Sequence, residues 1–304
     1  MRAFLFFGLF LWINSCQRVD TSHQYIFLGH PYDWNAPDKV DPRLAKLDYD
    51  LFDQIWLGGD ICSHLTQKKS TLDYVDDIFD LSSPNTLWTL GNHDVLEGNT
   101  QWISDHTHRP FFYTIWQDGI CIMVLNTNLF WYYDSPPPQE NCREKDRQME
   151  MMQSVLDTIQ DASHLVILHH LALLGDIRKN EKGTIPDSFN INPAIIHPSC
   201  DSNLLLKNWW YPQLVKVQNR GVDVIFVGGD FGMRARKFEF HSKEGVVFLG
   251  SGINGSLKRE FAPEYVTSFG RDFVLIFEHH PNIHKLDWQF CDLDSLLKVQ
   301  PSSD

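Results

Sequence analysis

The chain has little positive charge, and this shortage excludes one class of partner. Lysine and arginine together number 26 against 39 aspartate and glutamate residues, so the formal net charge is -13. A protein that binds nucleic acid needs a basic face to replace the counterions of the phosphate backbone, and nucleic acid is therefore not an expected partner. The acidic surface favours solubility and carries no information about the fold.

Long apolar runs are also missing after the first residues. Met1-Arg2 gives a positive start, and the apolar run from Ala3 to Ile13 is too short to span a bilayer, so residues 1–15 are interpreted as a signal peptide. Ile13-Asn14-Ser15-Cys16 resembles a bacterial lipobox, which implies lipidation of Cys16, a linker over residues 16–23 and a protein of the bacterial cell envelope, extracytoplasmic and anchored to the membrane through its lipid. The alternative is an ordinary cleaved signal in which Cys16 has no role.

Paired cysteine motifs are absent. None of the cysteines after Cys16 forms a CxxC, so neither a zinc knuckle nor a disulfide framework is expected. Cys121 lies in an apolar run and is expected in the core. Cys142 and Cys200 lie in polar insertions and could pair in an oxidising compartment, a question that the sequence leaves open.

Short apolar runs that lead into polar loops are what the chain does have. These predicted strands span residues 25–28, 55–57, 87–90, 165–168 and 224–227, with further strands around 246–249 and 273–277 that would complete a second sheet. Amphipathic patterns at 72–79 and 152–159 predict helices between them. The alternation indicates one α/β domain over residues 24–292, with insertions at 132–147 and 175–202 and a C-terminal tail over 293–304.

Polar residues follow each of the first five predicted strands, at the carboxyl ends where α/β sheets bind ligands. These segments are His30-Pro31-Tyr32-Asp33, Gly59-Asp60, Gly91-Asn92-His93-Asp94, His169-His170 and Gly229-Asp230. In this order and spacing they resemble the calcineurin-like metallophosphoesterase family over roughly residues 24 to 290. Leu125-Asn126-Thr127-Asn128 also resembles the family's Leu-Asp-Thr segment. The resemblance implies a two-sheet β-sandwich flanked by helices and a two-metal centre that hydrolyses phosphate esters.

The chemistry of such a centre explains its residue types. Two metal ions ~3.5–4 Å apart lower the pKa of bound water from ~15.7 toward ~7 and neutralise phosphoryl charge. Carboxylate, amide and imidazole ligands suit Mn, Fe or Zn. By resemblance, Asp60 is the bridging carboxylate, Asn92 the amide ligand and His169 the histidine of the fourth motif. His93 matches the histidine that contacts the phosphate and assists the leaving group, while His170 is expected to be structural.

Two motifs depart from the family. The first, Asp-x-His, is replaced by His30-Pro31-Tyr32, and the fifth, Gly-His-x-His, by Gly229-Asp230-Phe231-Gly232. The first motif thus loses a carboxylate and the fifth gains one. One predicted ligand set is complete and comprises Asp60, Asn92, His169 and Asp230. The other comprises His30, Asp60 and, as a phenolate that would favour ferric iron, Tyr32, with Asp33 as the substitute if the loop register shifts.

We therefore expect one divalent metal bound tightly and a second weakly. The leading hypothesis is a metal-dependent phosphoester hydrolase that acts outside the cytoplasm on a small phosphorylated substrate. The alternative is a catalytically weakened pseudoenzyme that binds a phosphorylated ligand or a partner protein at the envelope. The retained His93 favours the enzyme, and the altered first motif favours the alternative. Histidines in polar or edge contexts, including His279 and His280, are expected on the surface.

Overall fold

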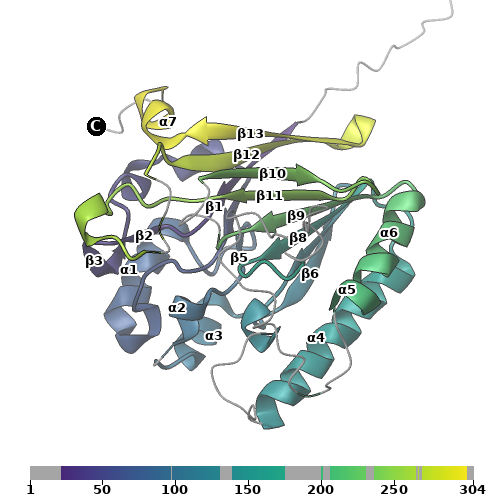
Figure 1. Ribbon diagram of the computed structural model, residues 1–304, viewed down its shortest axis with the longest axis horizontal. Coiled ribbons are helices and arrows are strands. Elements are labelled where there is room, and N and C mark those ends of the chain that lie inside the picture. The colour runs from purple at the N-terminus through teal and green to yellow at the C-terminus, as the bar shows by residue number, and fades with distance from the viewer. Residues whose placement is uncertain are drawn as a thin grey trace, which may run out of the picture.

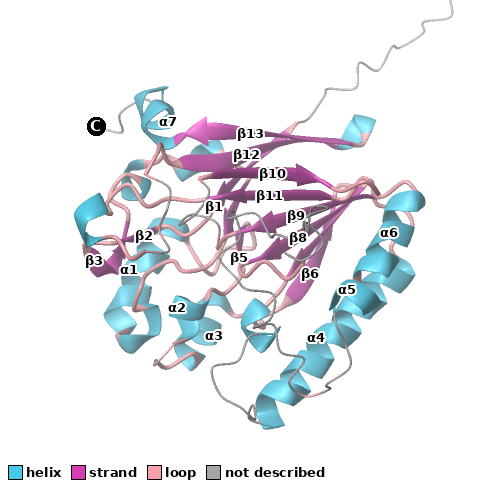
Figure 2. Ribbon diagram, in the orientation of Figure 1, coloured by secondary structure: helices cyan, strands magenta, loops and turns pink. Residues whose placement is uncertain are grey.

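Two β-sheets pack face to face, with helices on their outer sides, in the computed structural model (Figures 1 and 2). The structure describes residues 22–96, 98–130, 139–174, 200, 206–230, 236–264, 266 and 269–299. This confirms the predicted α/β class and the two-sheet sandwich. The predicted signal peptide and Cys16 lie outside the described residues. In the part that is described, every helix is too short or too polar to cross a membrane.

The first sheet has five strands in the order β13-β12-β1-β4-β5. Its parallel strands are β1 (His23–Leu28), β4 (Gln54–Leu57) and β5 (Thr86–Trp88). Two antiparallel strands complete it, β12 (Phe273–His280) beside β1 and β13 (Lys285–Asp292) at the edge. A small hairpin of β2 (Tyr32–Asp33) and β3 (Ala36–Val40) follows β1.

The second sheet has six strands in the order β10-β11-β9-β8-β7-β6. Its four central strands are parallel: β11 (Val247–Ser251), β9 (Asp223–Gly228), β8 (His164–His169) and β7 (Ile120–Val124). The edges are the antiparallel β10 (Lys237–His241) and β6 (Tyr113–Gln117). The strands expected around 246–249 and 273–277 exist, but they belong to different sheets, because β12 pairs with β1.

Helices cover the outer face of each sheet. The first sheet carries α1 (Lys69–Phe79), α2 (Asn92–Val95) and α3 (Gln101–Thr107). The second carries α4 (Gln139–Thr158), α5 (Leu206–Trp209) and α6 (Tyr211–Asn219), which lie together along one flank (Figure 1). Because α4 begins at Gln139, part of the predicted 132–147 insertion is helical. Likewise, α7 (Leu293–Val299) occupies part of the predicted tail.

The pleat of β8 divides its side chains between two apolar layers. Val166 and Leu168 belong to the cluster between the two sheets, with residues such as Phe27 and Trp56 of the first sheet. Leu165 and Ile167 belong to the cluster beneath α4, α5 and α6. Alternate residues of a strand point to opposite faces, so this division decides where the two histidines at the end of β8 point.

A disulfide joins Cys142 of α4 to Cys200, with 5.6 Å between the Cα atoms. This answers the question that the sequence left open. Cys121 is buried and free, as expected for a core residue. The disulfide ties the start of α4 to a residue that is distant in sequence.

Candidate metal centre

Loops from both sheets meet at the carboxyl ends of their parallel strands, where two Gly-Gly-Asp segments touch. A Cβ atom on Gly229 would overlap the carbonyl oxygen of Gly58, and one on Gly91 would overlap Asp60. Gly59 has a φ of +85°, and a Cβ there would collide with Gly91 and with the His170 ring. Glycine at these positions therefore lets the loops after β4, β5 and β9 approach one another closely and leaves room for the His170 ring.

Two residues of this region have left-handed backbone conformations. His30 and Asp60 have φ values of 53° and 54°, and both are buried. Asp80 and His108, which also have positive φ, each cap the end of a helix. A buried non-glycine residue in this conformation is strained unless its surroundings hold it, and such strain concentrates at functional sites.

The carboxylate of Asp60 faces two buried imidazoles. Its Oδ2 atom lies 3.5 Å from Nε2 of His30 and 3.3 Å from Nε2 of His170, and the three side chains are almost fully buried. These separations are close to the spacing of about 3.4 Å between two ligands that each lie ~2.1 Å from a tetrahedral zinc ion. Asp60 thus faces His30 and His170 at separations that two ligands of one metal ion would have.

The hydrogen bonds of His170 show what its contact with Asp60 requires. Nδ1 lies 2.7 Å from the carbonyl oxygen of Gly58, so that nitrogen carries a proton. In a neutral ring Nε2 then presents a lone pair to the carboxylate, and two electron-rich atoms repel. The contact is favourable only when a second proton or a cation lies between Nε2 and Oδ2.

Burial and mutual charge shift the acidities of this cluster. Burial lowers the pKa of His30 to about 3, against the attraction of Asp60. Burial would also lower the pKa of His170, but Asp60 and then Asp230 outweigh it and raise that pKa to about 10. Burial raises the pKa of Asp60, yet His170 leads the opposing charges that hold it below its usual range. Asp60 is therefore an anion.

The structure places His170, rather than the predicted His169, beside Asp60. His169 follows Leu165 and Ile167 to the other face of the sheet, where its ring lies 5.6 Å from that of Phe226. Its Nδ1 lies 2.9 Å from the carbonyl oxygen of Leu171, and burial lowers its pKa to about 4. The strand pleat therefore separates the two adjacent histidines.

The other predicted ligands are Asp230, Asn92 and Tyr32. The backbone N–H of buried Asp230 donates to the carbonyl oxygen of His170, and its carboxylate acts electrostatically on that ring. Asn92 is the half-buried first residue of α2. The ring of Tyr32 lies 4.5 Å from that of His30. Of the predicted set Asp60, Asn92, His169 and Asp230, His169 lies with the residues of the other face of β8, and the role of the set as metal ligands stays a prediction.

His93 is oriented from two sides. Its backbone N–H donates to Oδ1 of Asp60 at 2.8 Å, and its Nδ1 lies 3.1 Å from the carbonyl oxygen of Ser63. If Nδ1 carries the proton of that contact, Nε2 is the ring nitrogen that remains to exchange a proton with a ligand. The half-buried ring suits this role.

Asp94 is the positioning residue that the sequence did not reveal. One of its oxygens accepts from the backbone N–H groups of Asp60 and Gly91 at 2.9 and 2.8 Å and from Nε1 of Trp88, and the other accepts from Ile61 N–H. It thereby joins the loop of Asp60 to that of Asn92 and His93. Two further side chains brace these loops: Asn128 donates to the carbonyl oxygens of Leu90 and Gly91, and Thr127 accepts from Leu171.

The metal requirement can be tested against these donors. Across the described ranges, no three His, Cys, Asp or Glu side chains already surround one point as a ready ligand set. However, four imidazole nitrogens are buried without a hydrogen-bond partner, namely both of His30 and the Nε2 atoms of His169 and His170. Burying such nitrogens is costly unless their N–H groups and lone pairs find partners. The neutral rings of His30 and His169 each have one lone pair, and His170 gains one at Nε2 only when a cation replaces the proton there. The donors thus fit a cation beside Asp60, and they offer it ligands in pairs.

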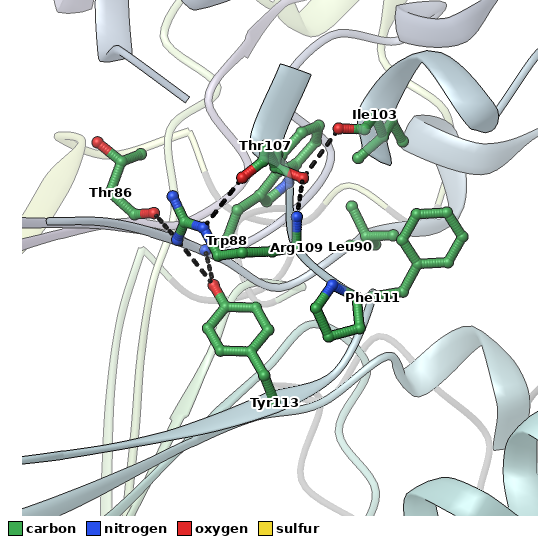
Figure 3. A pocket seen from close by; sticks show the side chains of 9 residues that line it. Thr86, Trp88, Leu90, Ile103, Thr107, Arg109, Phe111 and Tyr113 are labelled. Carbon is green, nitrogen blue, oxygen red and sulfur yellow. Dashed lines mark hydrogen bonds between the residues drawn. The ribbon is translucent and has the colours of Figure 1, made fainter. Parts of the chain in front are cut away.

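A cavity behind the β5 loop is not a competing substrate site. Its volume is about 10 Å³, room for about one water molecule. Figure 3 shows Arg109 reaching across it to Thr86, Thr107 and Tyr113, so its polar groups bind one another. The cavity therefore belongs to the packing beneath the loop.

No family model and no curated protein matches the chain in sequence. Solved structures do match its fold. One is GAP50, the anchor in the inner membrane complex of Plasmodium, with a TM-score of 0.52 and 9% identity over 90% of this chain and 85% of that one. Another is a dimetal phosphatase from Danio rerio, with a TM-score of 0.52 and 10% identity over 89% of this chain and 96% of that one. The chain therefore has the fold of a dimetal phosphatase.

Proposed function

We propose that this protein is a metal-dependent phosphoester hydrolase of the bacterial cell envelope. The observation that carries the proposal is the contact of Asp60 with Nε2 of both His30 and His170, at 3.5 and 3.3 Å. An anionic carboxylate that faces unpartnered imidazole nitrogens is a donor arrangement for a divalent ion. The fold of a dimetal phosphatase supports the same interpretation.

Asp60 and His170 would hold the tighter ion, because the second carboxylate, that of Asp230, lies nearby. Asn92 is the neutral ligand proposed from the motif. His30 and Asp60 would hold a weaker second ion, with Tyr32 as its proposed third ligand. Bound Mn, Fe or Zn would supply a hydroxide at neutral pH and neutralise phosphoryl charge.

The chain's own residues supply the remaining chemistry. Asp60 fixes the backbone of His93 through its Oδ1 atom, and Ser63 fixes the ring. Nε2 of His93 would then hold the proton that the leaving alkoxide needs. General acid catalysis of this kind typically contributes about 10²–10⁴-fold to the rate.

A second candidate function is that of a weakened enzyme that binds a phosphorylated ligand or a partner. It is favoured by the finding that, within the described part, the donors form pairs rather than a set of three or more. GAP50, which shares the fold, is described as an anchor. In this alternative the polar cluster stabilises the fold or binds phosphate without turnover.

Metal content and turnover in the same samples separate these functions. After loading with Mn, Fe or Zn and dialysis, wild type should retain about one equivalent per chain, and added Mn should raise its turnover of 4-nitrophenyl phosphate. His93→Ala should keep the metal and lose at least about a hundredfold in rate, whereas Asp60→Asn should lose both. Asp161→Asn, at an exposed site, is the matched control. Metal binding without turnover by wild type would favour the second candidate, and absence of metal would refute the proposed centre.

The location outside the cytoplasm rests on two further features. The lipobox-like sequence that ends at Cys16 predicts a lipid anchor, and the Cys142–Cys200 disulfide is typical of a protein in an oxidising compartment. Cys16→Ala should therefore move the protein from the membrane fraction to the soluble fraction. If the variant instead stays membrane-bound and unprocessed, the segment is an uncleaved anchor and the lipoprotein assignment is wrong.

A further inference from the structure

The rewritten first motif places a line of aromatic rings beside the proposed metal centre. The ring of Tyr32 lies 4.5 Å from that of His30, 5.0 Å from that of Trp34 and 5.9 Å from that of His93. Tyr32 is thus the centre of a group that we call the aromatic strip: His30, Tyr32, Trp34 and His93. His30 and His93 connect the strip to Asp60.

Exposure increases along the strip. His30 is fully buried and Tyr32 is 4% exposed, whereas Trp34 and His93 are half-buried. The strip therefore begins at the proposed metal centre and ends at rings that solvent, and hence a ligand, can reach. A ligand whose phosphoryl group lay at Asp60 would have its other half close to Tyr32, Trp34 and His93.

Contacts from the second sheet hold Trp34 in place. Its backbone N–H donates to the hydroxyl of Ser256 at 2.9 Å, and the side chain of Asn35 donates to the carbonyl oxygen of Ser256 at 2.8 Å. Ser256 lies in the loop that follows β11. These bonds hold the backbone at Trp34 and Asn35, and the half-buried Trp34 ring packs against those of Tyr32 and His30, at 5.0 and 6.2 Å. A ring that is already ordered in this way loses little entropy when a ligand stacks on it.

From this arrangement we infer that the aromatic strip is a subsite for the leaving group of the substrate, and that it takes a phosphate ester carrying a planar ring, such as an aryl group or a nucleobase. Planar rings stack on Trp, Tyr and His faces, and one such contact is worth roughly five- to hundredfold in affinity. The change from Asp-x-His to His-Pro-Tyr thus adds aromatic ring surface beside the proposed metal centre, while His30 and Tyr32 stay available to it as ligands. This inference rests on the proposed phosphoester hydrolase function.

Non-hydrolysable probes test the subsite without turnover. Calorimetric titration of metal-loaded protein with phenylphosphonate and with methylphosphonate measures the preference for a ring, which we expect to be at least about fivefold in wild type. Trp34→Leu should abolish the preference, and Trp34→Phe should keep most of it. Trp116→Leu, which removes a tryptophan that is 50% exposed on β6, is the matched control.

Each outcome separates the subsite from the hydrolase. Hydrolysis of phenyl phosphate and ethyl phosphate at equal efficiency, with equal binding of the two phosphonates by wild type, would overturn the subsite and leave the hydrolase intact. Preferential binding of the phenyl probe without hydrolysis of either ester would support the subsite and refute the hydrolase. A ring preference that survives in Trp34→Leu would place the ring elsewhere. The wild-type comparison does not depend on whether any variant folds.

Discussion

The two ends of the sandwich both bury polar side chains, but they use them differently. At the end where β1 and β4 begin, five side chains form a hydrogen-bonded relay. Trp56 donates to Gln54, Gln54 to Gln117 and Gln117 to Tyr25, and the Tyr25 hydroxyl lies 2.9 Å from Nδ1 of His279. At the other end, called the carboxyl end below, His30, Asp60 and His170 lie together, and several of the imidazole nitrogens have no hydrogen-bond partner.

The difference lies in the unpartnered atoms. Among the relay residues, Nε2 of His279 is the one buried side-chain atom without a partner, whereas His30, His169 and His170 leave four ring nitrogens unpaired. Among the described residues, the carboxyl end also contains the two buried non-glycine residues with left-handed backbone, His30 and Asp60. Buried polar groups that hydrogen-bond one another stabilise a core, whereas buried polar groups without a partner are available to bind a ligand. The first end is therefore a structural hydrogen-bond network, and the second is the candidate site.

The largest expected effect is that of Asp94→Ala at the carboxyl end. The substitution leaves three backbone N–H groups and the Trp88 indole without their acceptor, so the free energy of unfolding should fall by about 3–5 kcal/mol. Because these groups hold the loops of Asp60 and His93, metal retention should fall as well. Urea denaturation and elemental analysis measure the two effects. Asp161→Ala should change neither. An Asp94→Ala variant that is as stable as wild type and keeps its metal would contradict the proposed role of Asp94 in holding the two loops together.

A smaller effect, confined to stability, is expected from Tyr25→Phe at the end of the sandwich where β1 and β4 begin. Loss of the hydroxyl removes the shared partner of Gln117 and His279, which should lower the free energy of unfolding by about 1–3 kcal/mol. Metal content and turnover should match those of wild type. A change in metal affinity would show that the two ends are coupled and that the comparison is too simple.

The sequence predicted the two-sheet α/β fold and the edge of the sheets at which the candidate site lies, because both depend on local patterns. Apolar runs define the strands, and a loop after a parallel strand must lie at the carboxyl edge. Asp60 and His30 could be found in this way. The orientation of His169 and His170 could not, because the alternation of a strand says that neighbours face opposite sides but not which side faces the other sheet.

The contacts that complete both ends lie far apart in the chain. Tyr25 and His279 are separated by 254 residues, so no local pattern pairs them, and His279 was expected at the surface although it is fully buried. His280, also expected there, is half-buried. The hydrogen bonds of Asp94 join loops that are more than thirty residues apart. The sequence shows that Asp94 is a carboxylate, but the four groups that donate to it come together only in the folded chain.

The smallest expected effect depends on pH and comes from His279. Burial, with the nearby His23 and His164, lowers its pKa to about 4, against the opposing charge of Asp118. Between pH 6.5 and 4 the unfolded chain therefore binds a proton that the folded chain does not, so this residue makes stability fall as the pH falls through that window. His279→Gln should remove this contribution, on the order of 1 kcal/mol by pH 5.5, and flatten the decline relative to wild type. Urea denaturation from pH 7 to 4.5 measures both slopes, with the exposed His241→Gln as the control. Parallel slopes for wild type and His279→Gln would contradict this prediction. They would show that the folded protein binds a proton at His279 as readily as the unfolded chain does, so that the end where β1 and β4 begin, like the carboxyl end, can take up a positive charge.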